Sequence, residues 1–163
     1  MSRLLRQPGL LGLISAILMM ATELLIIKQQ ANAAGWILPI QSAILGLGIL
    51  ISLFITRSKA SEKPGFMELF QSGFRHFIAV TLAMVLFTYV NQKQHPEYAK
   101  QVAQEQRMQL EQTGRYTGSQ LDELTREAEK QFVTVAIYGT VFRYLIMGAV
   151  FAAVGSLALS RKK

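Results

Sequence analysis

Apolar residues are gathered in four long runs that polar segments separate. A helix of about 20 apolar residues crosses the hydrocarbon core of a bilayer, which is about 30 Å thick. Because backbone polar groups in lipid must be satisfied within the segment, each run predicts a transmembrane helix. The sequence therefore predicts an all-α membrane protein with four transmembrane helices, forming a single membrane domain over residues 1–163. The predicted spans cover residues 9–27, 36–55, 74–92 and 132–159.

A short polar turn between the first two runs predicts an antiparallel pair of helices. Two basic residues before the first run, Arg3 and Arg6, and the small residues of Ala31-Asn32-Ala33 after it are also typical of a cleavable signal peptide. However, the apolar run is long for a signal-peptide core, and it contains Glu23. We therefore interpret it as a retained membrane span.

The stretch that leads into the third run is amphipathic at helical spacing. Its aromatic and aliphatic residues alternate with Glu68, Ser72 and Arg75, which is typical of a helix lying at the membrane interface. These three residues share one face of the predicted helix. Two interpretations stay open for that face: contact with lipid headgroups or a partner, and simple solvation.

A polar insert, residues 93–131, separates the third and fourth runs. Pro96 is placed for the first turn of a helix that ends near Gln112, because proline at that position loses no hydrogen bond. Beyond a glycine-containing break, Ser119 and Asp122 predict a capping box for a second helix. We expect an extracytoplasmic helical hairpin, whose second helix continues without a break into the fourth span.

The fourth run contains a charged residue, Arg143, within its apolar sequence. An arginine at the centre of a span costs about 2.5 to 3.5 kcal/mol by insertion scales. Glu23 in the first run lies at a similar depth, which predicts an intramembrane ion pair of Glu23 with Arg143 between antiparallel spans. The pair is interpreted either as a structural clasp or as a proton relay or anion site.

Small residues mark a second face of the fourth run: Gly148, Ala152 and Gly155 recur at helical spacing. Such residues let helix backbones approach closely in a membrane, which predicts a helix-packing face. Its neighbour is either another span of the same chain or a second protein.

Charge and composition restrict the chemistry further. The net charge of +7 lies mainly beside the apolar runs and at the termini, which indicates membrane topology and argues against nucleic-acid binding. Both termini are predicted to be cytoplasmic in a bacterial inner membrane. With Cys 0 and two isolated histidines, His76 and His95, no metal site, cofactor site or catalytic residue is expected.

The chain resembles a family of bacterial inner-membrane proteins, domain of unknown function 4199. The resemblance rests on the early apolar hairpin, the aromatic lead Phe66-Met67-Glu68 followed by Gly73-Phe74, the charged helical insert with its Gly-Ser-Gln-Leu-Asp restart, and the lysines that end the last span. It implies a fold and brings no activity, cofactor or site.

These features predict a non-enzymatic accessory or scaffold subunit of a membrane complex, in contact with membrane lipids and with another membrane protein or further copies of itself. The alternative is a small transporter or ion-conducting or proton-conducting protein that uses Glu23 and Arg143.

Overall fold

The fold consists of helices throughout the part of the chain that the computed structural model describes, residues 7–28, 34–60 and 63–161. Within these ranges, four helices are long and apolar enough to cross a membrane, and α4 is shorter and polar. The predicted all-α class with four candidate spans is therefore confirmed. The helices are α1 (Pro8–Lys28), α2 (Ala34–Lys59), α3 (Phe66–Gln94), α4 (Pro96–Gln112) and α5 (Gly118–Arg161).

Some predictions lie outside the described residues. They concern the N-terminal Arg3 and Arg6, the Ala31-Asn32-Ala33 sequence and the terminal lysines. The described residues form two compact units. We call Met1–Met84 with Val141–Lys163 the bundle unit, and Val85–Thr140 the insert unit.

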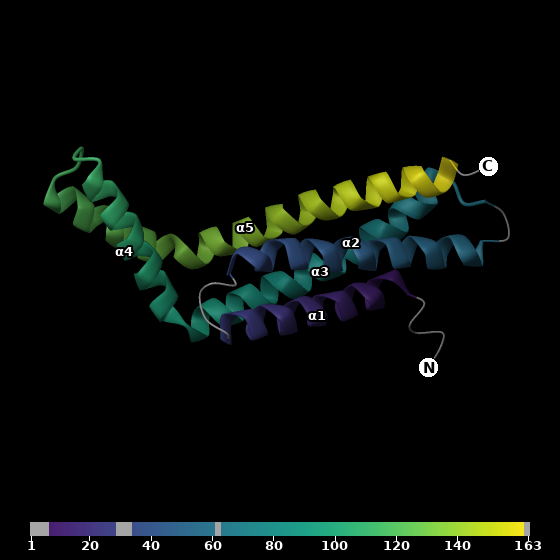
Figure 1. Ribbon diagram of the computed structural model, residues 1–163, viewed down its shortest axis with the longest axis horizontal. Helices are drawn as coiled ribbons and strands as arrows, with labels where there is room; N and C mark the ends of the chain where they lie inside the picture. Colours follow the sequence, from purple (N-terminus) through teal and green to yellow (C-terminus); the bar gives the residue numbers. More distant parts are fainter. Residues whose placement is uncertain (1–6, 29–33, 61–62, 162–163) are drawn as a thin grey trace. The chain divides into compact units, whose positions relative to one another are not determined.

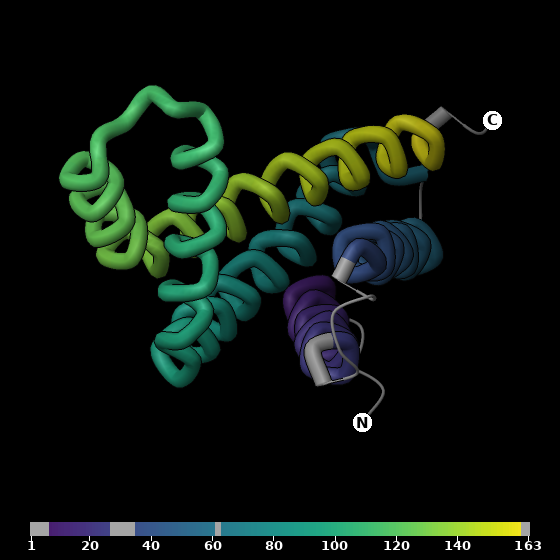
Figure 2. Tube along the Cα trace, turned by 60° about the vertical axis from the view of Figure 1, so that its left-hand side comes forward, coloured from purple at the N-terminus to yellow at the C-terminus, as the bar shows by residue number. Residues whose placement is uncertain are grey.

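In the bundle unit, α1 and α2 lie side by side and antiparallel (Figures 1 and 2). Glycine allows α1 to approach α3: a methyl group on Gly12 would collide with the backbone oxygen of His76 and lie 2.9 Å from Ala79 Cβ. Large apolar side chains of α1, α2 and α3 are completely buried, so these helices pack closely against one another. The buried side chains include Met19, Leu45, Ile49, Leu53, Leu69 and Val80.

The small-residue face of α5 packs against the same chain. A methyl group on Gly148 would lie 2.5 Å from Phe77 Cβ, and one on Gly155 would lie 2.7 Å from a methyl group of Leu53. Ala152 is completely buried, and its Cβ lies 2.8 Å from the position that a methyl group on Gly73 would take. The question that the sequence left open therefore has an answer: α2 and α3 fill this face.

Two helices are longer than the spans they contain. The amphipathic stretch at the start of α3 is continuous with its apolar part, and α5 is one helix of 44 residues, as expected. At about 1.5 Å per residue, a helix of that length is about 66 Å long, roughly twice the thickness of a hydrocarbon core. The polar start of α5 and its apolar part therefore belong to one continuous helix.

The insert unit contains the end of α3, all of α4, a short loop and the first half of α5 (Figure 2). In the loop, Gly114 has a φ of 64°, a conformation that favours glycine. Arg107 on α4 forms an ion pair of 2.8 Å with Asp122 on α5. A hydrogen-bonding contact of 3.2 Å joins the hydroxyls of Thr88 on α3 and Thr140 on α5.

The predicted capping box at Ser119 and Asp122 is wrong by two residues. The backbone N–H of Thr117 donates to the side-chain oxygen of Gln120 at 2.9 Å, and α5 begins at Gly118. Thr117 and Gln120 fit the capping-box spacing at least as well, because glutamine is a standard residue at its third position. Asp122 is thus free to pair with Arg107.

Candidate functional site: a hydrogen-bonded network within the bundle unit

Three helices of the bundle unit meet in a chain of hydrogen bonds. The Tyr144 hydroxyl on α5 donates to the Gln41 side-chain oxygen on α2 at 2.7 Å. The Gln41 amide nitrogen in turn donates to a carboxylate oxygen of Glu23 on α1 at 2.8 Å. Gln41 is 1% exposed and Tyr144 is 2% exposed, whereas Glu23 is half-buried. The amide therefore connects the carboxylate to α5 through a helix that lies between them.

Local sequence explains how these side chains reach one another. Glu23 lies five residues before the end of α1, and Gln41 lies seven residues after the start of α2. Since the helices are antiparallel and joined at that end, the two side chains come to similar depths, about 8 to 10 Å from the helix ends. The next residue, Ser42, donates to the Leu38 carbonyl oxygen at 2.7 Å and lies 3.3 Å from the sulfur of Met147 on α5.

The predicted partner of Glu23, Arg143, lies on a side of α5 that the described helices leave exposed. Among the described residues, ion pairs within 4.0 Å join His95 with Glu97 and Arg107 with Glu111 and Asp122. Direct contact of the Glu23 and Arg143 side chains is not among them, and it stays a prediction.

Sequence reasoning missed Gln41 and Tyr144, which complete the network. Gln41 was visible as an amide inside an apolar run, and polar residues in spans point to helix contacts. Tyr144 directly follows Arg143, so a rotation of about 100° along the helix separates their side chains. Helical periodicity therefore shows that Tyr144 and Arg143 face different directions, but it does not show which of them faces another helix.

The three residues of the predicted interfacial face of α3 differ in burial. Glu68 and Arg75 are exposed and line a surface groove of about 380 Å³ that also includes Lys59. Ser72 is buried, and its hydroxyl lies 3.1 Å from that of Ser52 and accepts a hydrogen bond of 2.7 Å from Thr56. Ser72 therefore joins α3 to α2, and its expected contact with headgroups or solvent is corrected.

Two buried polar side chains of the bundle unit, His76 and Ser156, lack a hydrogen-bond partner among the described residues. His76 on α3 is 0% exposed, and both of its ring nitrogens lack a hydrogen-bond partner among the described residues. The other histidine, His95, lies in the insert unit and pairs with Glu97 at 2.8 Å. In the described part of the chain, no group of three or more histidine, aspartate or glutamate side chains could hold a metal ion.

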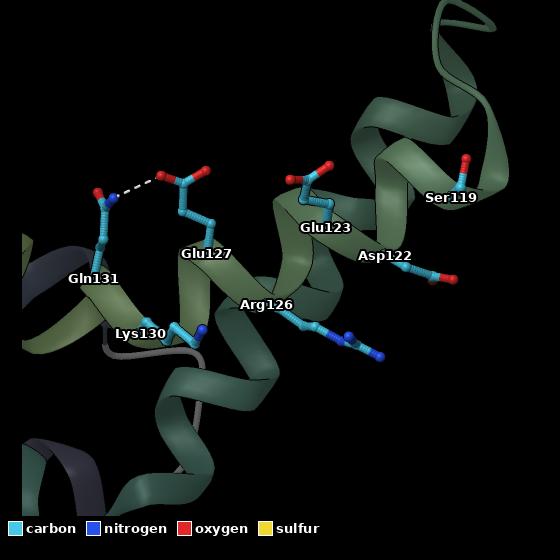
Figure 3. Close-up of a pocket in the computed structure, with 7 residues that line it drawn as sticks. All are labelled: Ser119, Asp122, Glu123, Arg126, Glu127, Lys130 and Gln131. Carbon is cyan, nitrogen blue, oxygen red and sulfur yellow. Dashed lines mark hydrogen bonds between the residues drawn. The ribbon is translucent and has the colours of Figure 1, made fainter.

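The insert unit has an apolar groove of about 430 Å³ between α4 and α5. Residues that line it include Val102 and Ala103 of α4, and Leu124, Phe132 and Val135 of α5. A larger hollow of about 790 Å³ is lined by α5 alone, so it is an open helix surface (Figure 3).

Figure 3 shows how charge is divided along this part of α5. Glu123, Glu127 and Gln131 point to one side, and Asp122, Arg126 and Lys130 point away from it. The Gln131 amide donates to Glu127 at 2.9 Å. The glutamates therefore form an acidic edge on the helix that carries the groove.

Comparisons with known proteins agree with the resemblance seen in the sequence. The profile of the family described as "Protein of unknown function (DUF4199)" matches residues 9–161, nearly the whole chain. The chain belongs to this family. Comparisons with curated proteins and with solved structures found no match.

Proposed function

We propose that this member of the DUF4199 family is a non-enzymatic accessory or scaffold subunit of a bacterial inner-membrane complex, and that the groove of the insert unit is its docking surface. The observation that carries the proposal is the groove between α4 and α5, whose rim is apolar although α4 is a polar helix. Val102 is 44% exposed there and Leu124 is 37% exposed. Exposed apolar grooves between helices are typical sites for an incoming helix.

The groove itself indicates the kind of partner. Phe132, Val135 and Ala136 line one end of it and belong to the predicted fourth span, whereas Val102 and Leu124 lie in the polar insert. A helix that follows the whole groove would leave the membrane, so the partner is a membrane protein. Glu127 lines the groove, and Glu123 lies one turn before it, so a basic edge on the partner helix is favoured.

A second copy of this chain fits the groove less well than another protein. The short basic groups of the sequence are Arg3 with Arg6, Arg57 with Lys59 and Lys63, and the last three residues. With four spans, these groups fall on the cytoplasmic side by the charge rule, and the insert falls on the other side. The insert's own basic residues are Lys93, Lys100, Arg107, Arg115, Arg126 and Lys130. They are interspersed with acidic residues, so a helix with a continuous basic edge is expected from a different chain.

The topology can be tested before any partner is known. Reporters fused within the loop at Gly114 should be active outside the cytoplasm, and fusions at the C-terminus should be active inside it. A reporter at Gly114 that is active in the cytoplasm would remove the basis for choosing a foreign partner.

The docking proposal is tested by purification in mild detergent. We expect a membrane protein to co-purify with the wild-type chain, and to be lost when Val102→Gln and Leu124→Gln are combined. Because only a few residues of an interface contribute about 2 kcal/mol or more to binding, two groove residues are changed together. Met108→Gln is the matched control, because Met108 is 54% exposed on α4 but does not line the groove. Retention of the partner by the double variant, or a monodisperse monomer from the wild type, contradicts the proposal.

Conduction of ions or protons is the second candidate, and the bonded chain of Tyr144, Gln41 and Glu23 is the observation that favours it. Flux in proteoliposomes should then disappear with Glu23→Gln and with Arg143→Met. If both variants only lower thermal stability and leave flux unchanged, the network is structural.

A further inference from the structure

A surface groove of the bundle unit lies where three of its helices meet at one end. The start of α1, the end of α2 and the start of α3 lie together there (Figure 1). The groove has a volume of about 380 Å³. We call it the polar groove, and its lining includes Pro8 of α1, Thr56 and Lys59 of α2, and Glu68, Ser72 and Arg75 of α3.

The floor of the polar groove joins two of the helices. Thr56 on α2 donates to the hydroxyl oxygen of Ser72 on α3 at 2.7 Å, and Ser72 is 5% exposed. Because these two hydroxyls bond to each other, they hold the walls of the groove together. The exposed charged side chains above them are left to bind a ligand.

Three charged side chains line the polar groove: Lys59, Glu68 and Arg75, all of them exposed. Among the residues that the structure describes, Glu68 and Arg75 form no ion pair within 4.0 Å. Arg75 follows Glu68 by seven residues, so the two lie on one face of α3, about 10 Å apart along its axis. A ligand between them would need an anionic group and a cationic group of its own.

The predicted spans place the polar groove at the membrane–water interface. Pro8 directly precedes the first predicted span, Thr56 directly follows the second, and Arg75 is the second residue of the third. Phospholipid headgroups lie at this level, just outside the hydrocarbon core. A headgroup can therefore enter the groove while its acyl chains stay in the core.

The charges of the polar groove discriminate among phospholipid headgroups. Arg75 and Lys59 match the oxygens of a phosphate, to which cationic side chains form charge-assisted hydrogen bonds. Glu68 repels a headgroup that is only anionic, whereas a primary ammonium group donates N–H bonds to its carboxylate. A choline headgroup carries no N–H and makes no such bond.

We propose that the polar groove binds a phospholipid whose headgroup joins a phosphate to a primary ammonium group, as in phosphatidylethanolamine. The phosphate lies against Arg75 and Lys59, and the ammonium group donates to Glu68. This site is independent of the docking groove of the insert unit, because the two belong to different units.

Native mass spectrometry of the delipidated full-length chain in detergent identifies the first lipid that binds. The protein is offered an equimolar mixture of dioleoyl phosphatidylethanolamine, phosphatidylglycerol and phosphatidylcholine, which differ in mass. We expect phosphatidylethanolamine to bind first, with an affinity at least about fivefold above that of either competitor.

Variants test the two contacts separately. Arg75→Gln removes a phosphate partner and should weaken binding of phosphatidylethanolamine at least about tenfold, whereas Arg57→Gln should change it less than about twofold. Arg57 is the matched control, because it lies in the last turn of α2 but does not line the polar groove. Glu68→Gln should keep the lipid bound and abolish the preference over phosphatidylcholine. Thermal melting of each variant checks that it is folded.

Four results would overturn the proposal. One is equal binding of the three lipids by the wild-type protein, and another is a preference for phosphatidylglycerol. A third is an equal loss in Arg75→Gln and Arg57→Gln, which would show general attraction by surface charge. The fourth is displacement of the lipid by an about tenfold excess of glycerophosphoethanolamine, which would identify a soluble ligand, since this compound has the headgroup without acyl chains.

Discussion

The bundle unit and the insert unit differ in how closely their helices pack. In the bundle unit, glycines bring helices into contact, and the small-residue face of α5 is filled by Phe77 and Leu53. In the insert unit, α4 and α5 are held by an exposed ion pair of Arg107 with Asp122, and an apolar groove stays open between them. The exposed apolar groove therefore lies in the insert unit, whereas the small-residue face of the last span is occupied by helices of the same chain.

The largest expected effect comes from filling a glycine contact in the bundle unit. Gly148→Ala places a methyl group 2.5 Å from Phe77 Cβ, so the helices must separate. Overpacking of this kind costs about 1 to 3 kcal/mol, to be measured by unfolding in detergent. The control is Gly139→Ala in the same helix, where a methyl group meets nothing within 4 Å. If Gly148→Ala is no less stable than Gly139→Ala, the close packing described for α5 is incorrect.

A comparable effect is expected when the hydrogen-bonded network loses its centre. Gln41→Leu leaves both Glu23 and Tyr144 without the partner they have now. Buried polar groups left unpaired cost about 1 to 3 kcal/mol, which thermal unfolding in the same detergent would measure. Ser42→Ala is the neighbouring control, and it should cost less because Ser42 donates mainly to its own helix. Equal stability of Gln41→Leu and wild type would show that the network contributes nothing.

A smaller effect is expected from the ion pair of the insert unit. Arg107→Gln removes contacts of 3.2 Å with Glu111 and 2.8 Å with Asp122. Since all three side chains are exposed by more than a third, the loss should be less than about 1 kcal/mol, and it should shrink as salt is added. Hydrogen exchange of α4 and the start of α5 provides the measurement. A loss as large as that of Gly148→Ala would remove the contrast between the units.

The smallest effect concerns the start of α4. The pKa of Glu97 is held below its ordinary value, because its own backbone N–H and the His95 ring hydrogen-bond to the carboxylate. A group with a lowered folded pKa stabilises fully above its unfolded pKa, and this contribution is lost as pH falls through the folded pKa. Relative to their intrinsic exchange rates, the amides in the first turns of α4 should therefore lose protection only at acidic pH. In Glu97→Gln protein, this acid dependence should be absent.

Sequence patterns predicted where the helices begin and end better than they predicted which helices pack against one another. Run length predicted the four spans, and periodicity predicted that α5 continues from the insert into the last span. Helical periodicity places a residue on a face, but it does not say which helix lies opposite. For this reason Ser72 was assigned to an outer face although it binds Ser52, and Gln41 was not recognised as the link between Glu23 and Tyr144.

The most direct test of the docking surface is photo-crosslinking in whole cells. A photoreactive amino acid in place of Val102 should give one discrete adduct with another membrane protein, and the same group in place of Met108 should not, because only Val102 lines the groove. An adduct at both positions, an adduct with a second copy of this chain, or none at Val102 in a correctly inserted protein would contradict the proposed role of the insert unit.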